Sequence, residues 1–455
     1  MRNAVCRLLK MALSSGVWAA CLVSPASALT LTEAYQSAVL NDPVFQSDVY
    51  AAQAGKEEKV LGRSNLLPEV SLTARKMENW AQVDSSKNAL ATSSLQTYQS
   101  LGESIYVRQP LLNLRKLSAS KEGELRAEVA ESQWVSGKQN VILRVTDAFL
   151  DAIIVERKVE FSIAKRKSVE AQSEQASRFY SKGEATLVDA DAGRSRLELA
   201  LILENESNDD RLTKISALSQ LTARVVSALP ELNFEPEKLD QDSGSSKTLD
   251  QWLELALANN PDIIQKRLSL ELAENEIKSN LSGDWPNIDL VANISRNNQD
   301  SFTTLNQDIK SHGVGIEMNW SLYKGGYNSA LVRQARAKAE QSRQDVAAAK
   351  IRLRLEVERQ YRKSLTGRLK INALSQAIKT DQERVKLAES LLGAGVKTLV
   401  DVLIAQEDLL QTKKDFGDAL KEFVMAHLKL RVLAGSLADD QIAWVEKYLL
   451  AGRPH

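Results

Sequence analysis

The chain has 455 residues, and its 59 Lys and Arg residues balance its 59 Asp and Glu residues. A neutral chain lacks the basic excess that a nucleic-acid partner requires, so nucleic acid is not expected as a ligand. Beyond residue 28 no run of about 20 apolar residues occurs, so no transmembrane helix is expected there. An exported chain without such a helix is either a soluble periplasmic protein or crosses a membrane as a β-barrel.

The first 28 residues are typical of an export signal peptide. Three basic residues precede an apolar stretch over 11–23, and small residues at 26–28 fit a cleavage site after Ala28. Cleavage would leave 56 Lys and Arg residues against 59 Asp and Glu residues, a net charge of −3. Both cysteines lie in this segment, so the mature chain is expected to have no disulfide. The alternative is that Cys21 becomes a lipidated N-terminus.

The remaining chain contains one pattern twice, with identical spacing. The first copy comprises Leu31, Ala38, Asn41, Pro43, Pro68, Leu72 and Ala74, and the second comprises Leu249, Ala256, Asn259, Pro261, Pro286, Leu290 and Ala292. A second motif, Gly-x-x-Thr-Leu-Val-Asp, begins at Gly183 and again at Gly395. The duplication predicts two copies of one structural unit. We assign them to 29–230 and 248–435, with a linker or equatorial segment over 231–247 and a C-terminal equatorial tail over 436–455.

Two long stretches without proline, rich in strong helix formers, predict very long helices. The predicted long helices lie near 115–181, 185–228, 328–392 and 397–434, and shorter helices lie near 31–64 and 249–281. A coiled-coil seam with one polar member is formed by Leu374, Ile378, Asp381, Val385, Ala388 and Leu392. A helix of about 65 residues is roughly 100 Å long, which no compact globular domain needs.

After each copy's second proline the hydrophobic period changes to two, which indicates strands. The apolar positions of the first strand pair are Val70, Leu72, Ala74, Ile105 and Val107, and those of the second are Ile288, Leu290, Ala292, Ile294, Val314, Ile316, Met318 and Trp320. Polar loops are expected near 81–100 and 297–310. Strands of about 9–11 residues would span an outer membrane, with interfacial aromatic residues at their ends. The candidates for that belt are Trp80, Trp285, Trp320 and Tyr323. The alternative is a small soluble hairpin with one buried face.

Four strands cannot close a membrane barrel, because the smallest closed examples have about 8 strands and lipid tolerates no open edge. A membrane-spanning chain must therefore share a barrel with copies of itself, and three chains would supply twelve strands.

The duplicated Asn-x-Pro element, the duplicated Gly…Thr-Leu-Val-Asp turn and the segment from Leu322 to Gly326 together resemble the TolC-like outer membrane factors. The resemblance covers nearly the whole mature chain. It implies a mainly α protein with a membrane β part. In such a protein a long antiparallel coiled-coil α-barrel adjoins four strands per chain, which contribute to a shared trimeric 12-stranded β-barrel. It also implies a location in the cell outer membrane with a large periplasmic part, and helix pairs that fold back at the tunnel's inner tip.

The two Gly…Thr-Leu-Val-Asp turns fit such a tip on physical grounds. Gly183 and Gly395 can end one helix in the left-handed conformation, and Thr186 and Thr398 can cap the next. The aspartates three residues further on, Asp189 and Asp401, suit the positive N-terminal end of that helix. One interpretation is that these residues are helix caps only. The other is that a trimer repeats each aspartate three times around a pore, which favours cations.

The resemblance implies specific roles for three tip residues. Asp401 matches a gate carboxylate of the family, and Asp189 and Lys397 match a pair that bridges neighbouring coils and holds the gate closed. Two positions depart from the family pattern: Ile404 replaces a second acidic ring, and Leu392 replaces a tyrosine of the latch. We therefore expect a gate with a single acidic ring and a weaker latch.

Nothing in the sequence indicates an enzyme, a cofactor or a metal site. The three histidines are not spaced as metal ligands, and no phosphate-binding loop or nucleophile elbow occurs. The leading hypothesis is a passive outer membrane exit duct for type I protein secretion. The expected partners are two more copies of the chain, a periplasmic adaptor, an inner-membrane ABC transporter and outer membrane lipid. The alternatives are multidrug or small-molecule efflux with a proton-driven pump, and, in another class, a non-channel periplasmic coiled-coil adaptor.

Overall fold

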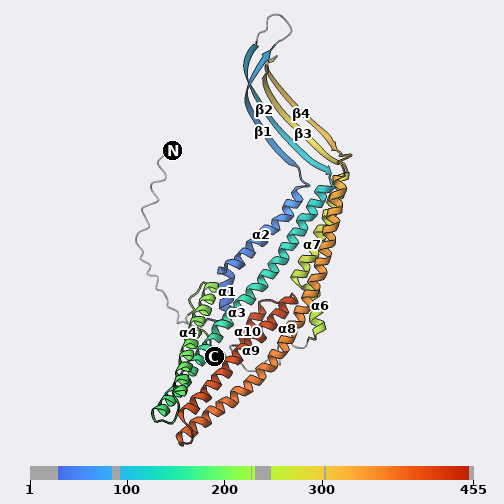
Figure 1. The fold of residues 1–455 in the computed structure, drawn as a ribbon. Coiled ribbons are helices and arrows are strands. Elements are labelled where there is room, and N and C mark those ends of the chain that lie inside the picture. Colours follow the sequence, from blue (N-terminus) through green and yellow to red (C-terminus); the bar gives the residue numbers. More distant parts are fainter. Residues whose placement is uncertain (1–28, 85–92, 227, 231–246, 302–303, 450–455) are drawn as a thin grey trace, which may run out of the picture.

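The computed structural model describes residues 29–84, 93–226, 228–230, 247–301 and 304–449. The expected signal peptide with Cys21 lies outside these residues, as do 231–246 of the expected linker and the last six residues of the expected tail. The described parts form an elongated, mostly helical molecule with four strands at one end (Figure 1). This architecture confirms the predicted combination of long helices and four strands per chain.

The two halves of the chain repeat the same order of elements. The first half comprises α1 (Leu31–Asn41), α2 (Pro43–Ser64), β1 (Glu69–Asp84), β2 (Ser93–Leu112), α3 (Leu114–Ser181) and α4 (Leu187–Thr222). The second comprises α6 (Leu249–Asn259), α7 (Pro261–Leu281), the short 3₁₀ helix η2 (Ser282–Asp284), β3 (Asn287–Ser301), β4 (Thr304–Asn319), α8 (Tyr327–Gly393) and α9 (Leu399–Leu433), followed by α10 (Asp440–Leu449). The exact domain limits assigned from the sequence stay a prediction.

The duplicated Asn-x-Pro element divides each shorter helical segment into two helices. Thr30 and Thr248 cap α1 and α6 through reciprocal hydrogen bonds with the third helical residue. Proline then occupies the first position of α2 and α7, where its missing N–H is not needed. The residue before each proline, Asp42 or Asn260, caps the new helix through its side chain.

The strands form one antiparallel sheet in the order β1–β2–β3–β4. Successive side chains alternate between the two faces of the sheet. One face, called here the apolar face, exposes Val70, Leu72, Ile105, Leu290, Ile294, Val314, Ile316 and Met318. The opposite, polar face carries mainly Ser, Thr, Asn, Gln and Gly. β1 and β4 are each paired on one side only, so the sheet has two open edges.

The strands are longer than the sequence indicated. They contain 16, 20, 15 and 16 residues in chain order, rather than about 9–11. The loops expected near 81–100 and 297–310 are wrong in extent, because β1, β2, β3 and β4 continue into those ranges. Ladder pairing depends on backbone N–H and C=O groups, so it continues where the side chains have become polar.

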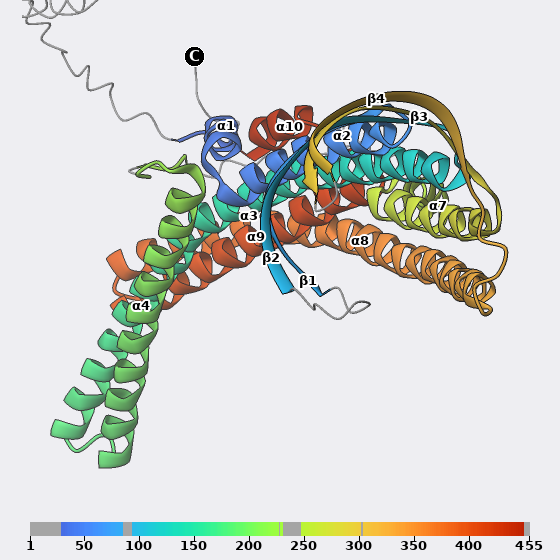
Figure 2. The ribbon, with the colours of Figure 1, turned by 90° about the horizontal axis from the view of Figure 1, so that it is seen from above.

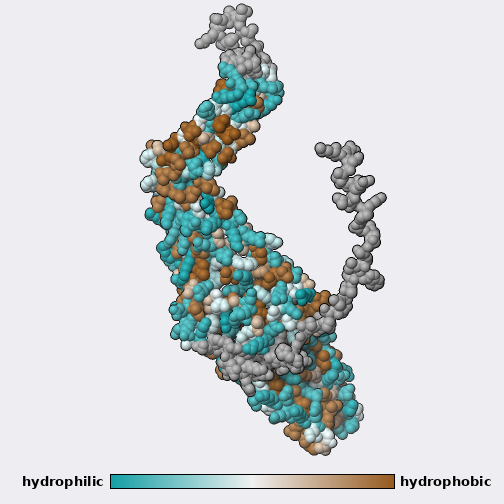
Figure 3. All heavy atoms as spheres, turned by 180° about the vertical axis from the view of Figure 1, so that it is seen from behind, coloured by the Kyte–Doolittle hydropathy of each residue, from teal (hydrophilic) through white to brown (hydrophobic). Residues whose placement is uncertain are grey.

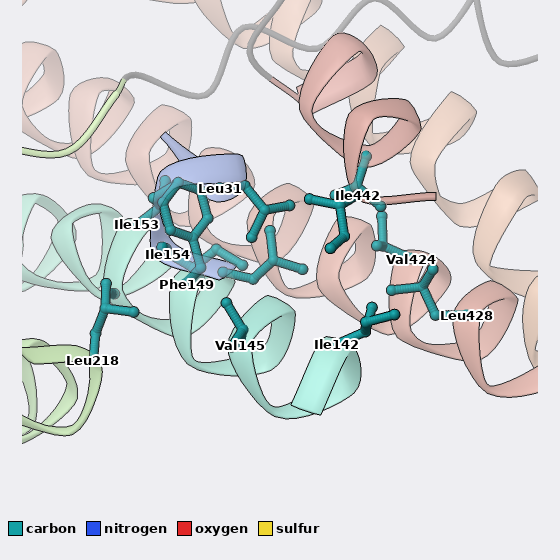
Figure 4. Close-up of a cluster of buried hydrophobic side chains, with 14 of the residues drawn as sticks. Leu31, Ile142, Val145, Phe149, Ile153, Ile154, Leu218, Val424, Leu428 and Ile442 are labelled. Atoms are coloured by element: carbon teal, nitrogen blue, oxygen red, sulfur yellow. The ribbon is translucent and has the colours of Figure 1, made fainter. Parts of the chain in front are cut away.

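Helix α3 is the central element of the helical part, and it contacts helices from both halves of the chain. The main core gathers side chains of α1, α3, α4, α9 and α10, including Leu31, Phe149, Leu218, Leu428 and Ile442 (Figure 4). Along the half nearest the strands, α3 packs against α2 (Figure 1). A Cβ atom on Gly123 would lie 2.8 Å from the Cα of Gly62, so glycine permits the close approach of these two helices.

The predicted coiled-coil seam of α8 faces α9. Ala388 is buried in a small cluster with Val402 and Ala405, while Asp381, the polar member of the seam, accepts a hydrogen bond of 2.7 Å from the Thr412 hydroxyl of α9. One helix boundary and one further helix differ from the sequence-based expectation. Helix α4 ends at Thr222 rather than near 228, because Ala223 adopts a left-handed conformation with φ 52°. Helix α10, within the expected tail, was not predicted.

Among the described helices, none combines sufficient length with enough apolar character to cross a membrane.

Candidate functional site

The two hairpin tips have the same backbone turn, built around a glycine. Gly183 and Gly395 have φ values of 78° and 72°, which glycine adopts without steric cost. The following amides, of Glu184 and Val396, each donate a hydrogen bond of 2.9 Å to a carbonyl five residues earlier, at Phe179 and Leu391. This Schellman arrangement satisfies the last carbonyls of α3 and α8 and ends both helices.

Each turn leads into a helix that starts with a reciprocal cap. The Oδ2 of Asp189 accepts hydrogen bonds from the N–H and hydroxyl of Thr186 at 3.0 and 2.7 Å. The Oδ2 of Asp401 accepts the same two bonds from Thr398, both at 2.8 Å. Bonds from Thr186 lower the pKa of Asp189, and bonds from Thr398, with the charge of Lys397, lower the pKa of Asp401. Both aspartates are therefore ionised at neutral pH and held at the tips.

Asp189 and Lys397 of one chain do not meet among the residues that the structure describes. The α3–α4 tip and the α8–α9 tip point in different directions when the molecule is seen from above (Figure 2). A contact between these residues would have to join two chains, so the latch stays a prediction. Of the two departures noted in the sequence, Leu392 packs against the Ala388 cluster within the second hairpin, whereas the Ile404 side chain is exposed.

The four candidate interfacial aromatic residues are all exposed and lie towards the two ends of the strands. Trp80 lies far along β1, whereas Trp285 lies two residues before the start of β3. Trp320 and Tyr323 follow β4, and the Trp320 indole donates a 3.0 Å hydrogen bond to the Asp284 carbonyl. From Val70 to Trp80 the strand extends about 33 Å. The same face also carries Lys76 and Glu78 in this stretch, so its apolar part lies near Val70 and ends before Trp80.

Apolar side chains gather over the half of the sheet nearest the helices (Figure 3). Above them the apolar face ends in a row of charged side chains, since Glu103 lies opposite Arg296 and Arg296 opposite Lys310 in the ladder. The Arg296 guanidinium also forms an ion pair of 3.0 Å with Asp308. A band of exposed apolar residues bounded by aromatic and charged residues is the arrangement expected for a surface in contact with lipid.

The structure also brings together charged residues that sequence reasoning missed. Asp151 of α3 forms ion pairs with Lys421 of α9 and with Lys214 of α4, the latter at 3.0 Å. Burial disfavours the charged form of Asp151, but the two lysines outweigh burial and lower its pKa. This contact joins α3, α4 and α9 above the tips. No local pattern in the sequence indicated it, because Asp151 and Lys421 are 270 positions apart.

On the polar face of the sheet, Arg108 of β2 contacts Asp289 of β3 and Glu317 of β4. The alternation of the strands could have identified these charged positions as facing the same side. Within the described residues no group of three or more His, Cys, Asp or Glu side chains is arranged to hold a metal ion.

Comparisons with known proteins agree with this geometry. The family described as outer membrane efflux protein matches residues 252–436. The alkaline protease secretion protein AprF of Pseudomonas aeruginosa is 26% identical over 440 residues, which cover 96% of this chain and 91% of the relative. The outer membrane protein TolC of Vibrio cholerae is 26% identical over 434 residues, 94% of each chain. The structure of the outer membrane protein VceC of Vibrio cholerae superposes with a TM-score of 0.66 at 15% identity, covering 89% of this chain and 96% of that chain. None of these names indicates an enzyme.

Proposed function

Because this chain is a TolC-like outer membrane factor, a channel protein of the outer membrane with a large periplasmic part, we propose that it is the exit duct for type I protein secretion. In this proposal three copies form the channel, a periplasmic adaptor docks at the helical tips, and an inner-membrane ABC transporter supplies the energy. The channel itself is passive, and its closed state is maintained at the tips.

The two open edges of the sheet are the observation that best supports assembly into a trimer. β1 and β4 each have one unpaired side, and an unpaired edge exposed to lipid leaves backbone N–H and C=O groups without partners. Pairing β4 of one chain with β1 of the next satisfies both edges, and three chains close a barrel of twelve strands. The sheet is strongly curved when seen from above in Figure 2, as a segment of a barrel wall would be.

The helical part supports the same assembly. In the half nearest the strands the helices adjoin in the order α2–α3–α7–α8. In the half nearest the tips they adjoin in the order α4–α3–α9–α8. Helices α2 and α4 therefore form one edge of the chain, and α8 forms the other. Both edges expose apolar side chains: Val60 and Leu61 of α2, Leu199 and Ile202 of α4, and Ile351, Leu355 and Leu369 of α8. Burial of these side chains between neighbouring chains would stabilise a closed α-barrel.

The tips are the proposed gate. Their helix caps hold Asp189 and Asp401 at the end of the molecule in the charged form. In a trimer three Asp401 side chains would surround the opening and favour cations. Contacts of Asp189 with Lys397 of a neighbouring chain would hold the hairpins together, and their loss would allow the hairpins to move apart.

The cargo assignment rests on the names of the relatives. AprF is named as an alkaline protease secretion protein, which favours protein as cargo. Small-molecule efflux remains the alternative, because the matched family is described by efflux. The non-channel coiled-coil adaptor is set aside, because the chain is a channel protein of the outer membrane.

Conductance across planar bilayers tests the gate. Asp189→Ala and Lys397→Ala should each raise single-channel conductance, because each removes a contact that closes the tip. Asp401→Ala should instead reduce cation preference, measured as the reversal potential in a salt gradient. Unchanged conductance in the first two variants would reject the latch, and an unaltered reversal potential would reject Asp401 as a pore residue.

Reconstitution in cells tests the cargo. A strain that lacks its own exit duct would receive this chain together with an ABC transporter, its adaptor and a protease substrate. Extracellular protease that depends on this chain supports type I secretion. Restored drug resistance without protease secretion would favour the small-molecule alternative.

A further inference from the structure

Charged side chains on the polar face of the sheet are concentrated at the end nearest the helices. Arg108 Nε lies 3.4 Å from Asp289 Oδ2, and Arg108 Nη2 lies 3.3 Å from Glu317 Oε1. The guanidinium also lies over the Tyr106 ring, 5.9 Å from its centroid. Glu69 is the ladder partner of Arg108, so its side chain belongs to the same face. We call Glu69, Arg108, Asp289 and Glu317 the strand-base cluster.

The cluster is held in place on the sheet. Arg108 connects three adjacent strands, since its partners belong to β3 and β4. The Asp289 side chain is only 14% exposed, and its second oxygen, Oδ1, is buried with no hydrogen-bond partner among the described residues. Glu317 is 46% exposed and lies on the open edge strand β4, while Glu69 is exposed on the other edge strand, β1.

The charges of the cluster do not cancel. Three carboxylates against one guanidinium leave a net charge of −2 per chain, or −6 for three chains. Elsewhere on the polar face, among strand side chains that the structure describes, Arg75 is the other charged residue. It lies six positions beyond Glu69, about 20 Å along the strand, which exceeds the Debye length of about 10 Å at 0.1 M salt.

We infer that the strand-base cluster is a second cation-selecting ring of the channel, located where the barrel lumen meets the helical tunnel. The inference rests on the proposed trimeric channel, in which the polar face lines the lumen because the apolar face meets lipid. Arg108 contacts both Asp289 and Glu317 but compensates only one of the three carboxylate charges, so the ring keeps its net negative charge. The ring is distinct from the Asp401 residues, which lie at the opposite end of the helices.

The dimensions of a twelve-stranded barrel make such a ring effective. Strands about 4.8 Å apart and tilted by about 40° place the backbone roughly 12 Å from the barrel axis. Side chains that project inward bring their charges closer, within about one Debye length of the axis at 0.1 M salt. Ions passing through the lumen therefore experience the negative potential, which raises the local concentration of cations.

Reversal potentials in planar bilayers test the inference. All variants carry Asp401→Ala, so that cation selection by the tip carboxylates does not obscure the contribution of the strand-base cluster. Glu317→Gln reduces the net charge per chain to −1, and Glu69→Lys reduces it to zero. Glu103→Gln is the matched control, because Glu103 lies on the same sheet but on the apolar face, opposite Arg296.

Glu69→Lys should lower the cation-to-anion permeability ratio by about twofold or more at 0.1 M salt, with Glu317→Gln intermediate and Glu103→Gln unchanged. At 1 M salt the differences should shrink, because the Debye length falls to about 3 Å. If Glu69→Lys and Glu317→Gln both form conducting pores with an unaltered permeability ratio, the inference is wrong, while the proposed channel assembly stands. A wild-type chain that forms no pores would reject the proposed channel assembly, and the inference with it.

Discussion

Replacing Asp42 tests how the first repeat is anchored to the central helix. Asp42 separates α1 from α2, and its side chain is only 4% exposed. Its carboxylate accepts hydrogen bonds from the amides of Val44 and Phe45 at 3.2 and 3.1 Å and forms an ion pair with Arg144 of α3. The second repeat provides a natural comparison, because Asn260 caps α7 from the equivalent position with an uncharged side chain.

The expected cost follows from these contacts. Asp42→Ala removes the helix cap, worth about 1 kcal/mol, and a charge-assisted hydrogen bond worth about 1.5–3 kcal/mol. Because Arg144 is 36% exposed and can be hydrated again, we take the lower end and expect a loss of about 2–3 kcal/mol per chain. Asp42→Asn keeps the cap, as Asn260 does, and loses only the charge, so its cost should be about half as large.

Thermal denaturation of the purified protein in detergent measures this effect, at fixed protein and detergent concentrations because assembly is linked to stability. The midpoints should fall in the order wild type, Asp42→Asn, Asp42→Ala. A control variant, Asp262→Asn, changes an acidic residue in the first turn of α7 that forms no ion pair among the described residues, and its midpoint should stay near that of the wild type. Equal midpoints for the wild type and Asp42→Ala would refute the reasoning.

Two further predictions concern the helical core. Burial, with the nearby charge of Arg431, lowers the pKa of His427 from 6.5 to about 4. The unfolded chain therefore binds the proton more readily, and stability should fall as the pH drops below 6.5, by about 2 kcal/mol at pH 5. His427→Gln should remove this part of the pH dependence of the thermal midpoint; an identical pH profile would contradict the assignment. Gly123→Ala should destabilise by about 1–3 kcal/mol despite alanine's better helix propensity, because its Cβ would meet the α2 backbone. Gly313→Ala, where a Cβ meets nothing within 4 Å, is the control, and equal midpoints for the two variants would refute the packing argument.

Local patterns in the sequence determined the kinds of element and their order. The long stretch without proline after Pro110 permits the 68 residues of α3, and the change of period after Pro68 and Pro286 indicates strands. The tip turns could also be recognised in the sequence, because the glycine and the Thr-x-x-Asp cap act within a few residues of chain. Each of these features depends on neighbours along the chain, which a sequence displays directly.

The sequence was less informative about where elements stop. The strands continue past the alternating segments, because pairing with the next strand stabilises them independently of side-chain polarity. Helix α4 ends early at Ala223, a residue with no intrinsic preference for the left-handed conformation found there. Helix α10 went unnoticed because its stability comes from docking on α1 and on the main core, rather than from its own length.

The sequence by itself determined that this chain has two copies of a unit made of short helices, a strand pair and a long helical hairpin. It also determined that four strands are too few to close a barrel. Only the tertiary structure decided which charged residues meet, such as Arg108 with Glu317, which are 209 positions apart. Periodicity reports the face on which a side chain lies. The residue opposite it depends on the register between distant strands and helices, which the packing of the whole chain sets.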